Sequence, residues 1–250
     1  MLAIAILAVG ALLTAQARPA PPPAPGSPPG PLSTLGGSSL TGWVVVLDPG
    51  HGGEDAGVEA GTLRESWLTL DLAHQTAAVL TAQGARVVLT RETDDGPGPD
   101  ARAATANRAR GHVFISLHVN HSRRPEASGA EIYIHAGAMT DLAAGTEAAG
   151  APASRLALVP WDRVQDRHAQ AAEALAAHLE SALGSRLPMS RHPRQRLPLR
   201  ALAGVDMPAV LVELAYLSNP EQALALVTPE FQASVAEAIR DALLLAGGLR

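Results

Sequence analysis

The chain has 250 residues and a mass of 25.7 kDa; 47% of its residues are hydrophobic and 17% are charged. Its formal net charge of −5 provides no positive surface for phosphate backbones, so we do not expect a nucleic-acid-binding protein. All 19 cationic residues are arginine, and cysteine is absent. This composition excludes lysine and thiolate nucleophiles and cysteine-ligated metals, so any bound metal must be held by His, Asp or Glu.

The first 42 residues precede the predicted folded domain. Residues 2–13 form an uncharged apolar run, shorter than the roughly 20 residues of a bilayer span, and Ala15 and Ala17 then supply a small-x-small cleavage pattern. We therefore expect residues 1–17 to be a signal peptide, with an uncleaved anchor as the alternative. Residues 18–42 are rich in proline and glycine, which predicts a semi-rigid spacer before a folded domain at 43–250.

Beyond the spacer, short apolar strands alternate with helices. Strands are predicted at 43–47, 86–90, 112–118, 130–135 and 209–214, and helices at 66–83, 100–110 and 161–183. Asn219-Pro220 and Thr228-Pro229 each read as an N-cap followed by proline in the first helical position. This order predicts an α/β fold of the phosphorylase/hydrolase-like type: an open, mixed and mostly parallel sheet with helices on both faces.

Four polar residues follow strand ends or begin a helix. His51 lies in the turn after the first predicted strand, His118 closes the third, and Glu213 ends the last apolar strand. Glu65 begins the first helix, after a loop at 52–64 that can fold back toward His51. Because ligands collect beyond the carboxyl ends of strands in open α/β sheets, we expect these side chains to converge. Two imidazoles and one carboxylate form a three-ligand zinc set with an open fourth position.

Each of these residues also has an ordinary explanation. A histidine at a strand end is commonly hydrogen-bonded or exposed, and a glutamate is favoured in a helix's first turn. Glu213 differs because it interrupts the apolar run AVLVELAYL. A buried carboxylate is destabilising unless a charge or a metal compensates for it, which favours a functional role for Glu213.

Six separated blocks resemble, in order and spacing, the zinc-dependent N-acetylmuramoyl-L-alanine amidases of the cell-wall amidase type 3 family. The blocks are VVVLDPGHGGEDAG, RESWLTLDLA, TRETDD, RAATANRARGHVFISLHVNHS, GAEIYIH and MPAVLVELAYLSNPEQ. The resemblance covers Trp43 to about Gly247 and makes residues 43–250 a catalytic domain. It implies that His51, Glu65 and His118 bind Zn²⁺ and that Glu213 is the catalytic carboxylate.

The resemblance also implies the reaction and its surroundings. The chain is expected to hydrolyse the amide between N-acetylmuramic acid and L-alanine in peptidoglycan, using a zinc-activated water with Glu213 as general acid and base. Such a protein acts in the periplasm, the cell envelope or the medium, without stable membrane association after signal cleavage. Two alternatives remain open: a carboxypeptidase-type zinc peptidase of the cell wall, which releases single amino acids, and a catalytically silent wall-binding or activator module.

Some positions depart from the family pattern or compete for the site. Thr69 stands where the family often has asparagine, and the final strand reads Glu-Leu-Ala-Tyr, ending at Tyr216, instead of Glu-Leu-Gly-Phe. Neither departure affects a proposed ligand. His121 and His135 are competing histidines without a matching motif position, and we expect them to line the site or to be exposed.

The long segment 136–160 suggests regulation. It has 25 residues, mostly Ala and Gly, where a compact domain typically uses about two to six. It follows the strand that ends at His135, which we expect to lie at the same sheet edge as the metal. Because some members of the similar family carry an insertion here, we hypothesise that part of 139–158 covers the site and is displaced by an activator protein. An exposed loop is the alternative.

Overall fold

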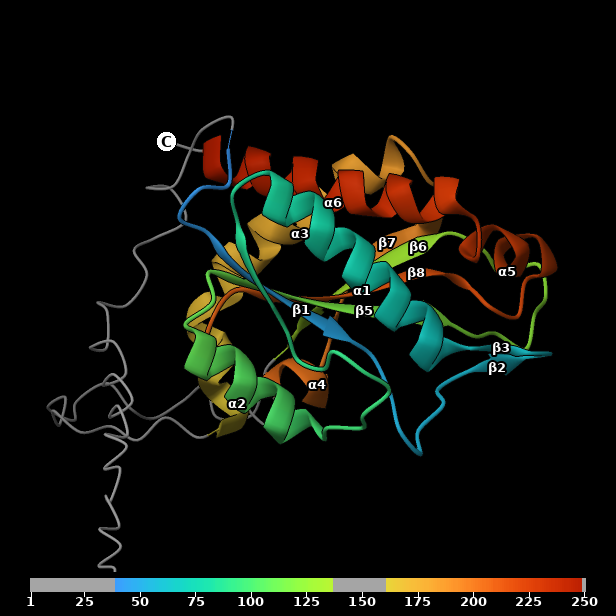
Figure 1. Ribbon diagram of the computed structural model, residues 1–250, viewed down its shortest axis with the longest axis horizontal. Helices are drawn as coiled ribbons and strands as arrows, with labels where there is room; N and C mark the ends of the chain where they lie inside the picture. The colour runs from blue at the N-terminus through green and yellow to red at the C-terminus, as the bar shows by residue number, and fades with distance from the viewer. Residues whose placement is uncertain (1–38, 137–160, 249–250) are drawn as a thin grey trace, which may run out of the picture.

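The computed structural model describes residues 39–136 and 161–248, which are built around one six-stranded sheet in the order β4-β1-β5-β8-β6-β7 (Figure 1). The strands are β1 (Val44–Pro49), β4 (Arg86–Leu89), β5 (Val113–Asn120), β6 (Ala130–His135), β7 (Met189–Leu197) and β8 (Ala209–Tyr216). Strands β4, β1, β5 and β8 are parallel, whereas β6 runs antiparallel to β8 and β7 follows β6 in parallel. The predicted mixed, mostly parallel sheet is confirmed.

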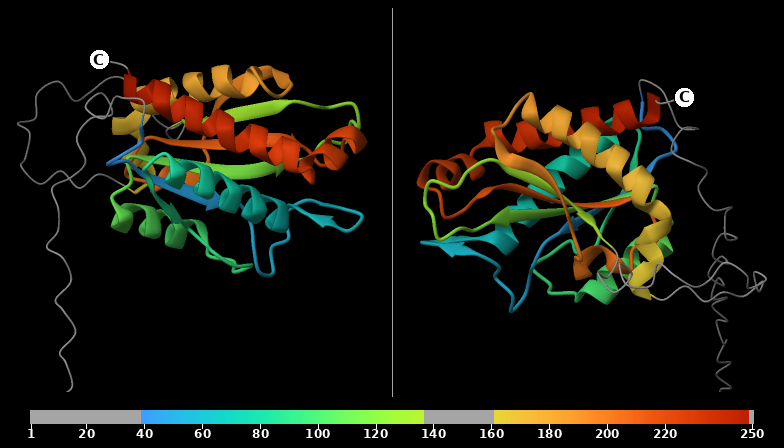
Figure 2. Two further views of the ribbon diagram at one scale, coloured as in Figure 1. Left: turned by 45° about the horizontal axis from the view of Figure 1, so that its top comes forward. Right: turned by 180° about the vertical axis from the view of Figure 1, so that it is seen from behind.

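Helices cover both faces of this sheet, as predicted, and the layers can be followed in Figure 2. One face packs against α1 (Glu65–Ala82), α3 (Ala169–Gly184) and α6 (Pro229–Gly248). The other face packs against α2 (Pro99–Ala109) and α4 (Arg200–Ala203). In the part of the chain that the structure describes, no helix is both long and apolar enough to cross a membrane.

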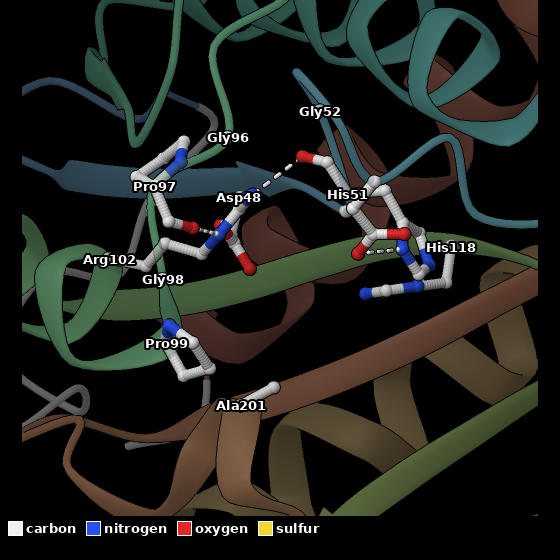
Figure 3. Close-up of a pocket in the computed structure, with 12 residues that line it drawn as sticks. Asp48, His51, Gly52, Gly96, Pro97, Gly98, Pro99, Arg102, His118 and Ala201 are labelled. Carbon is white, nitrogen blue, oxygen red and sulfur yellow. Dashed lines mark hydrogen bonds and ion pairs between the residues drawn. The ribbon is translucent and has the colours of Figure 1, made fainter.

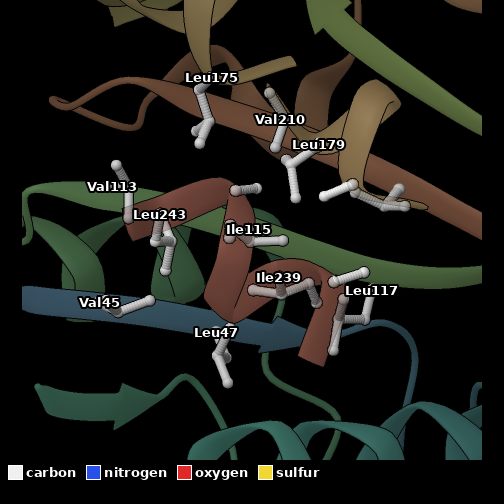
Figure 4. Close-up of a cluster of buried hydrophobic side chains, with 14 of the residues drawn as sticks. Val45, Leu47, Val113, Ile115, Leu117, Leu175, Leu179, Val210, Ile239 and Leu243 are labelled. Atoms are coloured by element: carbon white, nitrogen blue, oxygen red, sulfur yellow. The ribbon is translucent and has the colours of Figure 1, made fainter. Parts of the chain in front are cut away.

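Alternate residues of the central strands supply the two cores. Val45 and Leu47 of β1 face α1 and α6, together with the side chains of the neighbouring strands shown in Figure 4, whereas Val46 faces α2. All three side chains are fully buried. Strands covered on both faces need apolar residues at every position, which is why continuous runs such as VVVL predicted them.

Three elements differ from the sequence-based expectation. Residues 161–168 form a 3₁₀ helix (η3, Trp161–His168), so the predicted long helix begins only at Ala169. Strand β7 was not predicted, because MSRHPRQRL is polar; it pairs only with β6, and edge strands commonly carry charges and proline. The loop at 52–64 contains a short hairpin, β2 (Glu59–Ala60) and β3 (Leu63–Arg64), which was also missed.

The last two helices begin where their capping signals predicted. Helix α5 (Pro220–Leu226) is capped by Asn219, whose side chain accepts hydrogen bonds from the backbone N–H groups of Glu221 and Gln222. The hydroxyl of Thr228 likewise accepts from the N–H of Phe231, 3.2 Å away, at the start of α6. Both N-cap predictions are confirmed.

The direction of β6 contradicts one premise about the long segment. Glu131, near the start of β6, pairs with Glu213, whereas Ile134, near its end, pairs with Val210. His135 therefore lies at the edge opposite to the carboxyl edge, where β1, β5 and β8 end, so the segment after it does not begin beside the predicted metal site. Gln165 of η3, beyond the segment, donates to the carbonyls of Val205 and Met207 just before β8. The predicted cover at 139–158, like the signal peptide and most of the spacer, lies outside the described residues.

Candidate metal centre

His51 is placed by the turn that follows β1. It has a left-handed φ of 60°, and Gly52 beside it has a φ of 126°. Gly50 lies so close to His118 that an added Cβ would overlap the imidazole ring. The glycine at this position therefore permits the two histidine rings to approach, with centroids 4.9 Å apart and an interplanar angle of 79°.

Two buried arginines hold this turn in place. Arg102 of α2 pairs with Asp48 at 2.8 Å and donates to the carbonyl of His51 at 2.6 Å. Arg91, after β4, donates to the carbonyl of Gly50 at 2.9 Å and to that of Ser66 at 2.6 Å. The turn that carries His51 is thus tied to both α2 and the start of α1.

Thr69, a departure from the family pattern, belongs to this same network. Its hydroxyl donates to the carbonyl of Gly50 at 2.8 Å and accepts from Arg91 at 3.2 Å. The threonine therefore supports the turn that carries His51 without reaching the metal site.

Glu65, the first residue of α1, lies at the centre of the predicted ligand set and is only 2% exposed. Its carboxylate accepts hydrogen bonds from the backbone N–H groups of Val58 and Val119, each at 2.9 Å. The loop at 52–64 folds back toward His51 as expected: its residue Val58 bonds to Glu65, and Glu65 lies beside His51. One carboxylate oxygen lies 3.2 Å from Nε2 of His51 and the other lies 3.0 Å from Nδ1 of His118.

The donor atoms of His51, Glu65 and His118 all lie within 4.8 Å of one another. Within residues 39–136 and 161–248, this is the only group of three such residues with metal-binding geometry. Two imidazole nitrogens and a carboxylate are a suitable donor set for zinc, and Asp55 orients the first ring through a 2.8 Å contact with Nδ1 of His51. The residues present fit the metal that the sequence predicted.

Charge within the cluster shifts the protonation of its members. A hydrogen bond to Glu65 raises the pKa of His51 to about 9, against the opposing effect of burial. Burial raises the pKa of Glu65, but hydrogen bonds with His118 and His51 outweigh it and hold that pKa well below its usual range. Without a metal, Glu65 therefore favours the protonated form of His51.

Glu213 lies on the strand next to this cluster. It is in register with His118 of β5, and its Oε2 atom is buried without a hydrogen-bond partner. Burial raises the pKa of Glu213 to about 7; the positive charge of His118 opposes the rise, and the charges of Glu65 and Glu131 add to it. A carboxyl group with a pKa near neutrality can both accept and donate a proton.

Glu131 is a site residue that the sequence analysis missed. It lies directly across from Glu213 on β6 and is 7% exposed. Its carboxylate accepts hydrogen bonds from the hydroxyls of Tyr133 and Tyr216, the latter at 2.9 Å. Burial and this contact raise the pKa of Tyr216 to about 12 and hold that of Tyr133 above its usual range. The signal was available: like Glu213, Glu131 interrupts an apolar strand.

The competing histidines do not join the cluster. His121 is exposed. His135 is neither exposed nor site-lining, contrary to expectation: it is 8% exposed, lies at the opposite edge of the sheet and has its Nδ1 atom 3.0 Å from the carbonyl of Leu199. The reversed direction of β6 explains this difference.

A cavity of about 270 Å³ opens beside the two histidines. Figure 3 shows its walls, which come from the end of β1 and the turn after it, from α2 and the loop before α2, and from one residue each of β5 and α4. The lining residues are Asp48, Gly50, His51, Gly52, Asp55, Gly96, Pro97, Gly98, Pro99, Arg102, His118 and Ala201. Glu213 is not among them.

Known proteins are similar to this chain in sequence and in fold. Residues 45–244 match the model of the Amidase_3 family, described as N-acetylmuramoyl-L-alanine amidase. The germination-specific N-acetylmuramoyl-L-alanine amidase of Bacillus subtilis is 26% identical over 220 residues, covering 82% of this chain and 80% of that protein. The N-acetylmuramoyl-L-alanine amidase AmiC of Neisseria meningitidis is 30% identical over 210 residues, covering 78% of this chain but only 50% of that protein.

Solved amidase structures have the same fold as this chain. The N-acetylmuramoyl-L-alanine amidase AmiC2 of Nostoc punctiforme superposes with a TM-score of 0.64 at 27% identity, covering 82% of this chain and 97% of that one. The CwlD amidase of Clostridioides difficile, solved in complex with the GerS lipoprotein, shares the fold with a TM-score of 0.59 at 20% identity, covering 82% of this chain and 98% of that one. Since the family model spans most of the chain, this protein belongs to the Amidase_3 family of N-acetylmuramoyl-L-alanine amidases.

Proposed function

We propose that this enzyme is a zinc-dependent hydrolase that cleaves the amide between N-acetylmuramic acid and L-alanine in peptidoglycan, with Glu213 as its general acid and base. The observation that carries the proposal is the convergence of His51, Glu65 and His118 beside Glu213, whose Oε2 atom is buried without a hydrogen-bond partner. Membership of the amidase family supplies the substrate class.

Each residue has a distinct part in the proposed reaction. Zinc bound by His51, Glu65 and His118 would polarise the scissile carbonyl and favour ionisation of the attacking water. Glu213 accepts the proton of that water and delivers it to the leaving amine. The carboxylate of Glu131, which accepts hydrogen bonds from two tyrosine hydroxyls, helps to raise the pKa of Glu213 and so favours the protonated form needed for the delivery.

The proposal includes export, because peptidoglycan lies outside the cytoplasm. The apolar run and small residues of 1–17 support a signal peptide. A partner protein is also proposed, since the similar CwlD amidase was solved with the GerS lipoprotein. Its contact with residues 136–160 stays a hypothesis, without the premise that this segment begins at the carboxyl edge.

Product analysis tests the function. Purified full-length protein is incubated with peptidoglycan, with and without a chelator, and the soluble products are identified by mass spectrometry. We expect free stem peptides that begin with L-alanine, together with intact glycan strands, and no products after chelation until zinc is restored. Single amino acids would instead identify a carboxypeptidase, and no hydrolysis with zinc bound would favour a silent module.

Zinc binding is expected to depend on pH, because zinc requires a neutral His51 and the metal-free protein holds a proton there up to a pH of about 9. The apparent affinity should therefore rise by at least about tenfold per pH unit between pH 7 and 8, with at least one proton released per zinc. Competition with a chromophoric chelator measures the affinity, and calorimetry in two buffers of different ionisation enthalpy counts the protons. An affinity that does not change over this range would contradict the assignment.

A further inference from the structure

Two glutamates face each other across the neighbouring strands β6 and β8. Glu131 pairs directly with Glu213 in the antiparallel ladder, and Glu213 is in register with His118 on its other side. Residues paired in this way point to the same face of a sheet, so the three side chains form a row beside the metal centre. Like charges directly opposite each other destabilise a sheet, so the stability of β6 does not explain a glutamate at position 131.

Glu131 takes up hydrogen-bond donors that Glu213 lacks. One carboxylate oxygen of Glu131 accepts from the hydroxyl of Tyr216 at 2.9 Å, and the other accepts from the hydroxyl of Tyr133 and, at 3.4 Å, from the side-chain amide of Asn120. Among the residues that the structure describes, no donor reaches the buried Oε2 atom of Glu213. The charge of Glu213 nonetheless helps to raise the pKa of both tyrosines, so their hydroxyls lie within electrostatic range of it.

A hydrogen bond donated to Glu213 would oppose its proposed role. Such a donor occupies a lone pair that must accept the proton of the attacking water, and it favours the charged form over the form that can deliver a proton. A tyrosine hydroxyl without its acceptor on Glu131 has Glu213 as the next carboxylate, because opposite residues of an antiparallel pair have Cβ atoms about 4.5–5.5 Å apart. The two carboxylates therefore compete for the same donors.

We propose that Glu131 is a positioning residue, which holds the hydroxyls of Tyr133 and Tyr216 and so keeps them from donating to Glu213. This inference rests on the proposed function of Glu213 and adds a residue that acts on it through two tyrosines. It also gives a partner to the hydroxyl of Tyr216, one of the departures from the family motif. The role is separate from the charge of Glu131, because it no longer matters once both hydroxyls are removed.

Removing first the acceptor and then the hydroxyls tests the proposal. Glu131→Leu and Glu131→Met, of which the second keeps the side-chain length, both leave the tyrosines without their acceptor. Because a hydrogen bond to a charged group is strong, we expect either change to lower kcat for peptidoglycan amide hydrolysis by about tenfold or more, with little change in KM. Adding Tyr133→Phe and Tyr216→Phe should raise kcat again by about fivefold or more. The same two changes should not raise kcat while Glu131 is intact.

The control is Glu230→Leu, which removes an exposed glutamate in the first turn of α6 and should keep the kcat of the wild type. Zinc content and melting temperature are measured for every variant. If the two phenylalanines do not raise kcat in the Glu131 variants, the proposal is wrong, because they cannot repair a loss of charge or packing. An unchanged kcat in Glu131→Leu would also overturn it. So would a rise in KM alone, which would make the tyrosines substrate contacts.

A crystal structure of zinc-loaded Glu131→Leu gives a readout that does not depend on catalysis. We expect the hydroxyl of Tyr133 or Tyr216 within about 3 Å of a carboxylate oxygen of Glu213. Two hydroxyls that both point away from Glu213 would refute the inference. If a hydroxyl does contact Glu213 but the wild-type protein hydrolyses no amide, the role of Glu131 in holding the tyrosines stands and the proposed function fails.

Discussion

Replacing Glu213 with Gln is expected to lower kcat for peptidoglycan amide hydrolysis by at least about 10²-fold, while the fold and the zinc content remain intact. Glutamine has nearly the same shape as glutamate, but its amide cannot accept the proton of the attacking water or deliver one to the leaving amine. The carboxyl is suited to both steps because burial raises its pKa to about 7 and its Oε2 atom has no hydrogen-bond partner. Steady-state hydrolysis by the purified variant measures kcat, and elemental analysis measures its zinc content.

Glu230, exposed in the first turn of α6, offers a matched control, because Glu230→Gln makes the same chemical change far from the site. Its activity should equal that of the wild type. If Glu213→Gln keeps activity within a few-fold of the wild type, the proton transfer belongs to another group. If it loses zinc, Glu213 is instead a fourth metal ligand.

Replacing His118 with Ala should remove both zinc and hydrolysis. His118 lies at the end of β5, 3.0 Å from Glu65, and its loss leaves one imidazole and a buried carboxylate, which is too few ligands for a zinc site. The buried carboxylate also loses one of the contacts that stabilise its charge, so the metal-free variant should unfold at a lower temperature. Zinc content per chain, residual activity and the melting temperature are measured on the same preparation.

His121 provides the comparison, because it is exposed and only three positions along the chain from His118. His121→Ala should retain full zinc and activity. Full metal occupancy in His118→Ala would remove His118 from the ligand set, and zinc loss in His121→Ala would add the neighbouring histidine to it.

The sequence by itself determined the strands that cross the middle of the sheet and the convergence of four side chains. Strands β1, β5 and β8 are buried on both faces, and such strands require the unbroken apolar runs that predicted them. His118 and Glu213 end two of these strands, and parallel strands end at the same edge, so the topology brings the two side chains together. The capping residues Asn219 and Thr228 act on their own helices, which is why local pattern sufficed for them as well.

Tertiary structure alone decided the direction of β6 and everything that depends on it. A strand's apolar alternation is the same in either direction, so AEIYIH could not reveal that Glu131 pairs with Glu213 or that His135 lies at the opposite edge. Strand β7 is specified by its pairing with β6 and not by its own polar sequence, because an edge strand gains its order from its neighbour. The contact between Tyr216 and Glu131 joins residues 85 positions apart, and only the folded chain creates it.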